Sequence, residues 1–160
     1  MIKQLNYNDL PEVLSVIHKS FATVAVEFNI TRENCPNHTS FMKLETLQKR
    51  FSNGELMFAV HSGDEFIGFV GISDAGNGTY ELHNLAVLPE YRQNGYGKML
   101  IDYAKEKVRA FGGQKITIGI IEENTRLMNW YTANGFVHTG TRKFDHLPFT
   151  VGFMEWRDNK

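Results

Sequence analysis

A short loop in the middle of the chain carries the residues best suited to bind an anion. It reads Tyr91-Arg92-Gln93-Asn94-Gly95-Tyr96-Gly97-Lys98 and separates an apolar, strand-like stretch from a long amphipathic one. The first turn of a helix has unpaired N–H groups at the positive end of its dipole, so a loop that enters a helix can hold a phosphate. Gly95 and Gly97 leave room for an anion, while Arg92 and Lys98 add positive charge. The loop predicts a phosphate site; the alternative is a glycine-rich helix start that binds no ligand.

Two common nucleotide-binding motifs do not describe this loop. A P-loop needs Ser or Thr directly after its Lys to hold magnesium, and this chain has Met99 there. A dinucleotide fingerprint needs a third glycine three residues after the second, and this chain has Leu100 there. These departures disfavour a plain nucleotide-binding module.

A second segment narrows the choice of ligand. It begins at Asn124 and ends at Gly135-Phe136, with Tyr131 between them. The spacing Arg92-x-x-Gly95-x-Gly97 resembles the acetyl-CoA motif of the GNAT superfamily of acyl-CoA-dependent N-acetyltransferases. The second segment is similar to a further block of that superfamily, which it matches at the four positions just named. By this resemblance the chain is identified as a member of the superfamily.

The resemblance implies acetyl-CoA as the co-substrate and no metal. In the superfamily two neighbouring strands, here 79–88 and 115–121, splay apart, and the pantetheine arm lies between them. The residues that the resemblance implies as cofactor-binding are Leu85, Ala86, Val87, Arg92, Gln93, Asn94, Gly95, Tyr96, Gly97, Lys98, Asn124 and Tyr131. Many members have glycine where this chain has Gln93, a departure that is tolerable if Gln93 keeps a negative φ.

The resemblance also implies catalytic roles. Acetyl transfer to an amine needs a neutral nucleophile, stabilisation of the thioester oxyanion and a proton for the leaving thiolate. Tyr131 matches the family tyrosine that donates this proton; the alternative is a core tyrosine. Glu81 is the first candidate for the general base because some members keep a glutamate there, and His83 on the same strand face is the second. The alternative is an exposed Glu and a packed His. A backbone N–H near Val87 is the expected oxyanion donor.

The acceptor is expected to be a primary amine of a small molecule that attacks directly in a ternary complex. Gly119 stands where some N-terminal protein acetyltransferases of the family carry a glutamate base, which argues against a ribosomal-protein substrate. Segments 21–39 and 142–149 are expected to line the acceptor groove with aromatic and acidic residues that suit a cationic amine. These residues are Glu27, Phe28, Glu33, His38, Asp145, His146 and Phe149. The alternatives are a peptide or protein amine, or a non-catalytic domain that binds acyl-CoA as a sensor or partner. A homodimer is compatible with the sequence.

Composition sets the wider limits. A chain of 160 residues is expected to form a single domain, 1–160, with a core that needs no disulfide or metal. Seventeen Lys and Arg against 18 Asp and Glu give a net charge of -1, which does not suggest nucleic-acid binding. The absence of a long apolar run or a leader-like start predicts a cytoplasmic protein without membrane segments. Cys35 is alone, and the six His residues show no metal-ligand spacing.

Apolar periodicity predicts the elements that position these residues. The expected fold is α/β in three layers, as in GNAT domains, with a mixed central sheet of about six to seven strands, about four helices and the order βααβββαβαββ. Helices are expected from residue 8 or 9 to 21, from 39 or 40 to 53, from 95 to 111, and over the block that begins at Asn124. Residues 22–38 are expected to be irregular. The expected strands are 2–5, 56–62, 65–74, 79–88, 115–121, 136–142 and 149–156.

Overall fold

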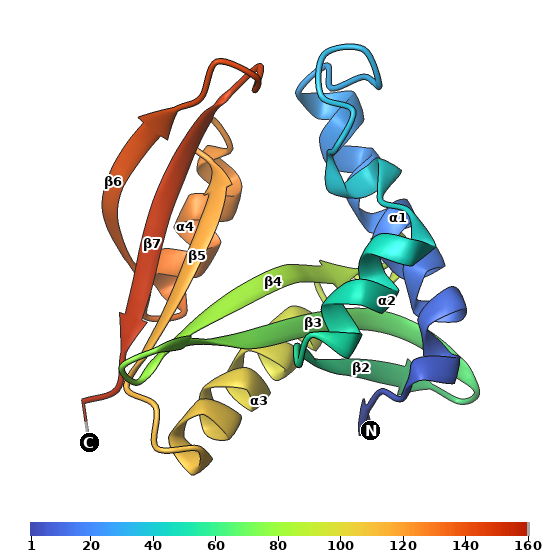
Figure 1. Ribbon diagram of the computed structural model, residues 1–160, viewed down its shortest axis with the longest axis vertical. Coiled ribbons are helices and arrows are strands. Elements are labelled where there is room, and N and C mark those ends of the chain that lie inside the picture. The colour runs from blue at the N-terminus through green and yellow to red at the C-terminus, as the bar shows by residue number, and fades with distance from the viewer. Residues whose placement is uncertain (160) are drawn as a thin grey trace.

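The computed structural model describes residues 1–159 and shows one seven-stranded sheet with helices on both faces (Figure 1). Within these residues the strands are β1 (Ile2–Gln4), β2 (Leu56–Ser62), β3 (Glu65–Gly76), β4 (Thr79–Val87), β5 (Lys115–Ile121), β6 (Val137–Lys143) and β7 (Thr150–Arg157). The α-helices are α1 (Leu10–Glu27), α2 (Leu44–Ser52), α3 (Tyr96–Ala110) and α4 (Thr125–Ala133). The order along the chain is the predicted βααβββαβαββ, and the predicted fold class is confirmed.

The sheet divides in the middle. Its strand order is β1-β2-β3-β4-β5-β7-β6, and β4 and β5 form the one parallel pair among the described strands. These two strands pair only from Thr79 opposite Lys115 to Glu81 opposite Thr117. Beyond that point they diverge, and Figure 1 shows β5, β7 and β6 turning away from β2, β3 and β4. Backbone groups along the two separating edges therefore lack a strand partner.

Two apolar cores fix the helices to the sheet. Helices α1 and α2 cover one face through four fully buried side chains, Leu10, Val13, Ile17 and Leu47. Helix α3 belongs to the other core, again through four fully buried side chains, Leu100, Ile101, Ala104 and Val108. Leu10, Val13 and Ile17 on α1 have the spacing of three and four residues that marks one helix face, and so do Ile101, Ala104 and Val108 on α3. Within residues 1–159 no helix is both long and apolar enough to cross a membrane, and no three His, Cys, Asp or Glu side chains are placed to hold a metal ion.

The first two helices have boundaries that differ from the sequence prediction. Helix α1 continues to Glu27, although irregular chain was predicted from residue 22. Its added turn brings Ala25 into a small buried cluster with Ile30 and Cys35, so tertiary packing overrides the turn-forming residues nearby. Helix α2 begins at Leu44, because Thr39–Phe41 form a separate 3-10 turn that ends in extended backbone.

Candidate active site

A cleft of about 810 Å³ opens where β4 and β5 diverge. We call it the β4–β5 cleft. It is walled by both strands, by the loop before α3 and by α4. Every residue that was predicted to bind the cofactor lines this cleft, with the exception of Asn94. The structure therefore brings three segments that are separate in the sequence, around residues 86, 95 and 128, to one place.

The loop before α3 has a backbone shape that few residue types adopt easily. Gly95 has a φ of 84° and Gln93 a φ of 64°. The positive φ contradicts the condition under which Gln93 was expected to be tolerable, so this residue carries backbone strain that glycine would not. Asn94 supports the loop from behind, since its side-chain amide donates to the backbone oxygens of Tyr91 and Arg92, 3.1 Å away in both cases. Helix α3 begins directly after Gly95, and the N–H groups of its first turn lack carbonyl partners within the helix.

Gly97 and Arg92 have structural roles that the sequence did not predict. A Cβ on Gly97 would lie 3.2 Å from the Trp130 ring, so the missing side chain lets α3 approach α4. The Arg92 guanidinium donates to the backbone oxygens of Ser20, at 3.0 Å, and Val87, at 3.3 Å. Arg92 therefore fastens α1 to the end of β4 while it lines the cleft, and is not a free charge at the rim.

Tyr131 has features of both alternatives that the sequence left open, a general acid and a core tyrosine. Its side chain is buried, with 5% exposed, and its ring meets Trp130 and Phe136 edge to face. It also lines the cleft, and its hydroxyl has no hydrogen-bond partner within residues 1–159. Burial raises the pKa of the Tyr131 phenol well above its ordinary value, so the phenol keeps its proton at neutral pH. Asn124 lines the cleft as well, and its Oδ1 caps α4 by accepting the Leu127 N–H at 3.2 Å.

A second cavity, of about 710 Å³, adjoins the cleft and shares Thr39 and Asn84 with it. It is bounded by the chain before α2, by α2 itself and by β3 and β4. His83 lines this second cavity, whereas Glu81 lines neither cavity, and 54% of its side chain is exposed. The two cavities thus meet one residue beyond His83.

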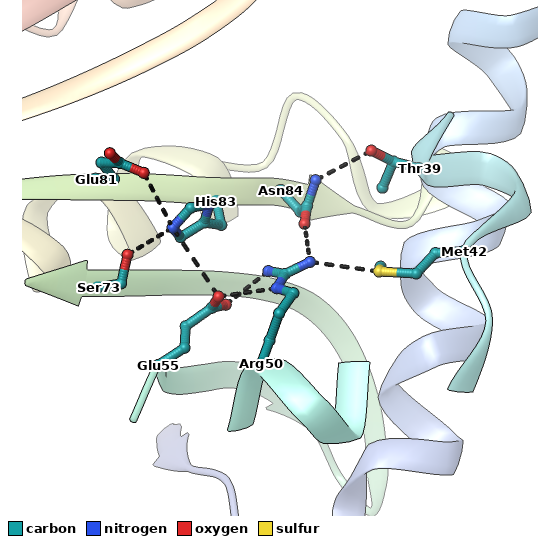
Figure 2. A network of polar contacts seen from close by, with 8 residues as sticks. All are labelled: Thr39, Met42, Arg50, Glu55, Ser73, Glu81, His83 and Asn84. Atoms are coloured by element: carbon teal, nitrogen blue, oxygen red, sulfur yellow. Dashed lines mark hydrogen bonds and ion pairs between the residues drawn. The ribbon is translucent and has the colours of Figure 1, made fainter. Parts of the chain in front are cut away.

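His83 lies among oxygen atoms and is only half buried. Its Nε2 is 2.7 Å from Ser73 Oγ, 3.8 Å from Glu81 Oε2 and 4.0 Å from Glu55 Oε1 (Figure 2). Burial lowers the pKa of His83 below its ordinary value of 6.5; the carboxylates of Glu55 and Glu81 oppose this change, and the Arg50 charge adds to it. The imidazole is therefore neutral at pH 7 and able to accept a proton.

Arg50 is the centre of a polar network that sequence reasoning missed (Figure 2). Its guanidinium donates to both oxygens of the buried Glu55, at 2.8 and 2.6 Å, and to Asn84 Oδ1 at 2.7 Å. Asn84 in turn donates to Thr39 Oγ1 at 3.1 Å. The network joins four segments with no fixed spacing, so no motif could reveal it. The one available signal was Asn84, a poor strand former inside an apolar strand.

Two backbone features make room for this network. The β3–β4 register slips between Phe69 and Gly71, because β4 has one residue more than β3 over this stretch. Asn84 lies in the resulting bulge with a φ of 54°. A Cβ on Gly71 would lie 2.1 Å from Glu55 Oε2, so only glycine at this position leaves space for the buried carboxylate.

The aromatic and acidic residues that were expected around the acceptor are largely elsewhere. Three of them line the cleft, namely Glu27, His38 and Phe149, and none lines the second cavity. Four line neither, namely Phe28, Glu33, Asp145 and His146. Glu27 is bound to Arg126 at 2.7 Å. Fewer than half of the expected residues therefore line a cavity, because sequence does not show which side chains of a loop face inward; the composition of the acceptor groove stays a prediction.

Comparison with known proteins agrees with this arrangement. Residues 24–136 match the family model described as the Acetyltransferase (GNAT) family. The matched span exceeds half of the chain and contains both sequence motifs as well as the β4 bulge. The chain belongs to the GNAT family and is an N-acetyltransferase.

Individual relatives are distant but extend over nearly the whole chain. An uncharacterized N-acetyltransferase in the pepI 3′ region of Lactobacillus delbrueckii subsp. lactis is 23% identical, over 94% of this chain and 89% of that protein. The ribosomal-protein-S18-alanine N-acetyltransferase of Escherichia coli has a TM-score of 0.78 at 16% identity, covering 98% of this chain and 92% of its own. The PaiA N-acetyltransferase of Thermoplasma acidophilum, solved with coenzyme A, has a TM-score of 0.73 at 22% identity, and the match covers 99% of this chain and 98% of that one. At these identities the structural likeness shows the fold alone.

Proposed function

We propose that residues 1–160 form one catalytic domain that moves an acetyl group from acetyl-CoA to a primary amine of a small molecule. The observation that carries this proposal is the meeting of the two cavities at Asn84. The cleft presents a phosphate-type loop and the protonated Tyr131, while the second cavity presents the neutral His83. Adjoining sites for two substrates are what direct attack in a ternary complex requires.

The β4–β5 cleft suits a CoA thioester for two reasons. Beyond Glu81 and Thr117 the facing strand edges are unpaired, so the backbone of Leu85–Val87 is free to bond the amides of the pantetheine arm. The loop that ends at Gly95 points the first turn of α3 into the cleft, which suits the pyrophosphate. The Thermoplasma relative, solved with coenzyme A, supports the same class of ligand.

His83 is proposed as the general base ahead of Glu81, which reverses the order that the sequence favoured. The primary amine of a substrate has a pKa of about 10 and arrives protonated, so a group must take its proton before attack. His83 lines the second cavity, is neutral at pH 7, and is held by Ser73. Glu81 lies 3.8 Å away at the exposed side, where it stabilises the imidazolium once formed.

Tyr131 is proposed as the general acid. The amine nitrogen forms a bond to the acetyl carbon, the carbon–sulfur bond breaks, and the CoA sulfur takes a proton from the Tyr131 hydroxyl. The proton that the nitrogen loses as the amide forms restores the Tyr131 phenol. The raised pKa keeps that proton in place until a thiolate develops, and the hydroxyl has no competing partner within residues 1–159. A backbone N–H near Val87, on the edge of β4 that β5 leaves, is the proposed oxyanion donor.

The test is amine-dependent release of CoA. Wild-type protein should consume acetyl-CoA only when a primary amine is present and give an acetylated product by mass spectrometry. Tyr131→Phe should bind acetyl-CoA normally but transfer about 10²-fold more slowly, the usual scale of a general acid. Gly95→Glu, which places negative charge at the phosphate loop, should lose acetyl-CoA binding without loss of fold. Binding of acetyl-CoA with no amine-dependent release would contradict the proposal and favour a sensor domain.

A further inference from the structure

The charged side chains of the second cavity do not balance. Four titratable groups line it: Lys43, Arg50, Glu55 and His83. Arg50 and Glu55 neutralise one another through two hydrogen bonds, at 2.8 and 2.6 Å. His83 is neutral at pH 7, since burial lowers its pKa. The Lys43 side chain has no ion pair or hydrogen bond within residues 1–159, so the cavity keeps one uncompensated positive charge.

The rest of the lining supplies no anion. The polar members away from the network are Asn37, Thr46 and Asn53, which can donate hydrogen bonds but carry no charge. The carboxylate of Glu55 is buried, with 5% of its side chain exposed, and both of its oxygens accept from Arg50. Glu81 stands outside the cavity at the His83 end, where the reacting amine would lie. A second ammonium group on an acceptor would therefore meet Lys43 and no negative partner.

On the basis of the proposed function, we infer that the acceptor carries a carboxylate in addition to its reacting amine. Lys43 at the cavity rim supplies the charge for that carboxylate, and the side-chain amides of Asn37 and Asn53 supply hydrogen-bond donors. The same unpaired Lys43 charge repels the second ammonium group of a diamine or polyamine, so the cavity selects by repulsion as well as by attraction. The substrate class is an amino acid type of amine and excludes polyamines.

A matched set of acceptors tests the inference. The compounds are 6-aminohexanoate, hexylamine and 1,6-diaminohexane, which share one chain length and differ only at the far end. The first should have a kcat/KM about tenfold or more above that of the diamine, with hexylamine between them. Dissociation constants for the three, measured calorimetrically with CoA-saturated protein, should follow the same order without any turnover.

Charge reversal at the rim gives the variant and its control. Lys43→Glu should weaken binding of 6-aminohexanoate and strengthen that of 1,6-diaminohexane. Lys49→Glu is the matched control, because it changes the charge by the same amount at an α2 residue that lines neither cavity. It should leave the order of affinities for the three compounds unchanged.

Equal or tighter binding of the diamine to wild-type protein would overturn the inference, and so would an unchanged order in Lys43→Glu or no binding of 6-aminohexanoate. Selective binding without turnover would support the inference and contradict the proposed function. Turnover that prefers the diamine would support the proposed function and contradict the inference.

Discussion

The β4–β5 cleft and the second cavity adjoin one another, but they are built from different parts of the chain. The cleft presents backbone: the unpaired edge of β4, the loop with positive φ at Gln93 and Gly95, and the start of α3. The second cavity presents side chains from separate segments, joined by the bonds of Arg50. Backbone groups remain when a side chain changes, whereas a side-chain network loses several contacts at once. We therefore expect single substitutions to cost more of the free energy of unfolding at the second cavity than at the cleft.

The largest effect is expected from Arg50→Met. It leaves the Glu55 charge buried without its partner, which typically costs about 3–5 kcal/mol of the free energy of unfolding. Denaturant unfolding measures this loss directly. The double variant Arg50→Met with Glu55→Met should recover most of the stability, because it removes both charges together.

A surface pair on the cleft side provides the comparison. Lys98→Met breaks the exposed pair of Lys98 with Asp102 and should cost less than about 1 kcal/mol. Equal stability of Arg50→Met and Lys98→Met would show that the buried network stabilises the protein no more than a surface pair does. The expected difference in stability between the two regions would then be wrong.

The pH dependence of kcat distinguishes the two candidate bases. His83→Gln should lower kcat about 10²-fold at neutral pH and less at high pH, where the amine deprotonates unaided. Glu81→Gln should change kcat little. Because burial lowers the pKa of His83 below 6.5 and only the neutral imidazole accepts a proton, the wild-type rate should fall only below pH 6.5.

The same profile reports on Arg50, whose positive charge helps to lower the pKa of His83. In Arg50→Met the fall in rate should move to higher pH. A wild-type profile in His83→Gln together with a changed one in Glu81→Gln would make Glu81 the base.

The same contrast explains what could be predicted from the sequence. The residues expected to bind the cofactor fall in three short runs, 85–87, 92–98 and 124–131, and both motifs lie on the loop or helix that positions them. The spacing of these runs, together with the family resemblance that it carries, therefore singled out Gly95, Tyr131 and their neighbours, which line one cleft, and strand and helix periodicity predicted the order of the elements. The second cavity is assembled by tertiary folding. Nothing in the spacing of Thr39, Arg50 and Asn84 shows that they are bonded, because α2 must first dock on the sheet.

Errors in the prediction have the same origin. The extra turn of α1 is stabilised by contacts with the small cluster that contains Cys35, which no local propensity reveals. The positive φ of Gln93 is imposed by the loop as a whole, while the residue type predicts a negative φ. Glu81 ranked above His83 by position in the family; the reverse order is our proposal, because His83 lines the second cavity and Glu81 does not, a distinction that sequence does not show.

Gly71→Ala tests the space that the second cavity keeps for its carboxylate. The added Cβ would lie 2.1 Å from Glu55 Oε2, so the carboxylate or β3 must shift, at a cost of about 1–3 kcal/mol. Gly140→Ala on β6 is the matched control, because nothing lies within 4 Å of the added atom and φ is not positive. The control should be neutral in thermal unfolding. If Gly71→Ala also leaves thermal unfolding unchanged, the Glu55 carboxylate has room to move away from residue 71.

The smallest effect is expected in the cleft, at Gln93. Its φ of 64° costs a residue with a Cβ about 1–2 kcal/mol, whereas glycine adopts it freely but loses more conformational entropy on folding, by about 0.5–1 kcal/mol. Gln93→Gly should therefore raise the free energy of unfolding by about 0.5 kcal/mol. Gln93→Ala separates the causes, because it removes the side chain but keeps the strain, and it should give no gain. Acetyl-CoA affinity should stay the same in both variants, since the loop binds through its backbone. A large loss of affinity in Gln93→Ala would show that the side chain itself holds the ligand, and the cleft would then depend on side chains as the second cavity does.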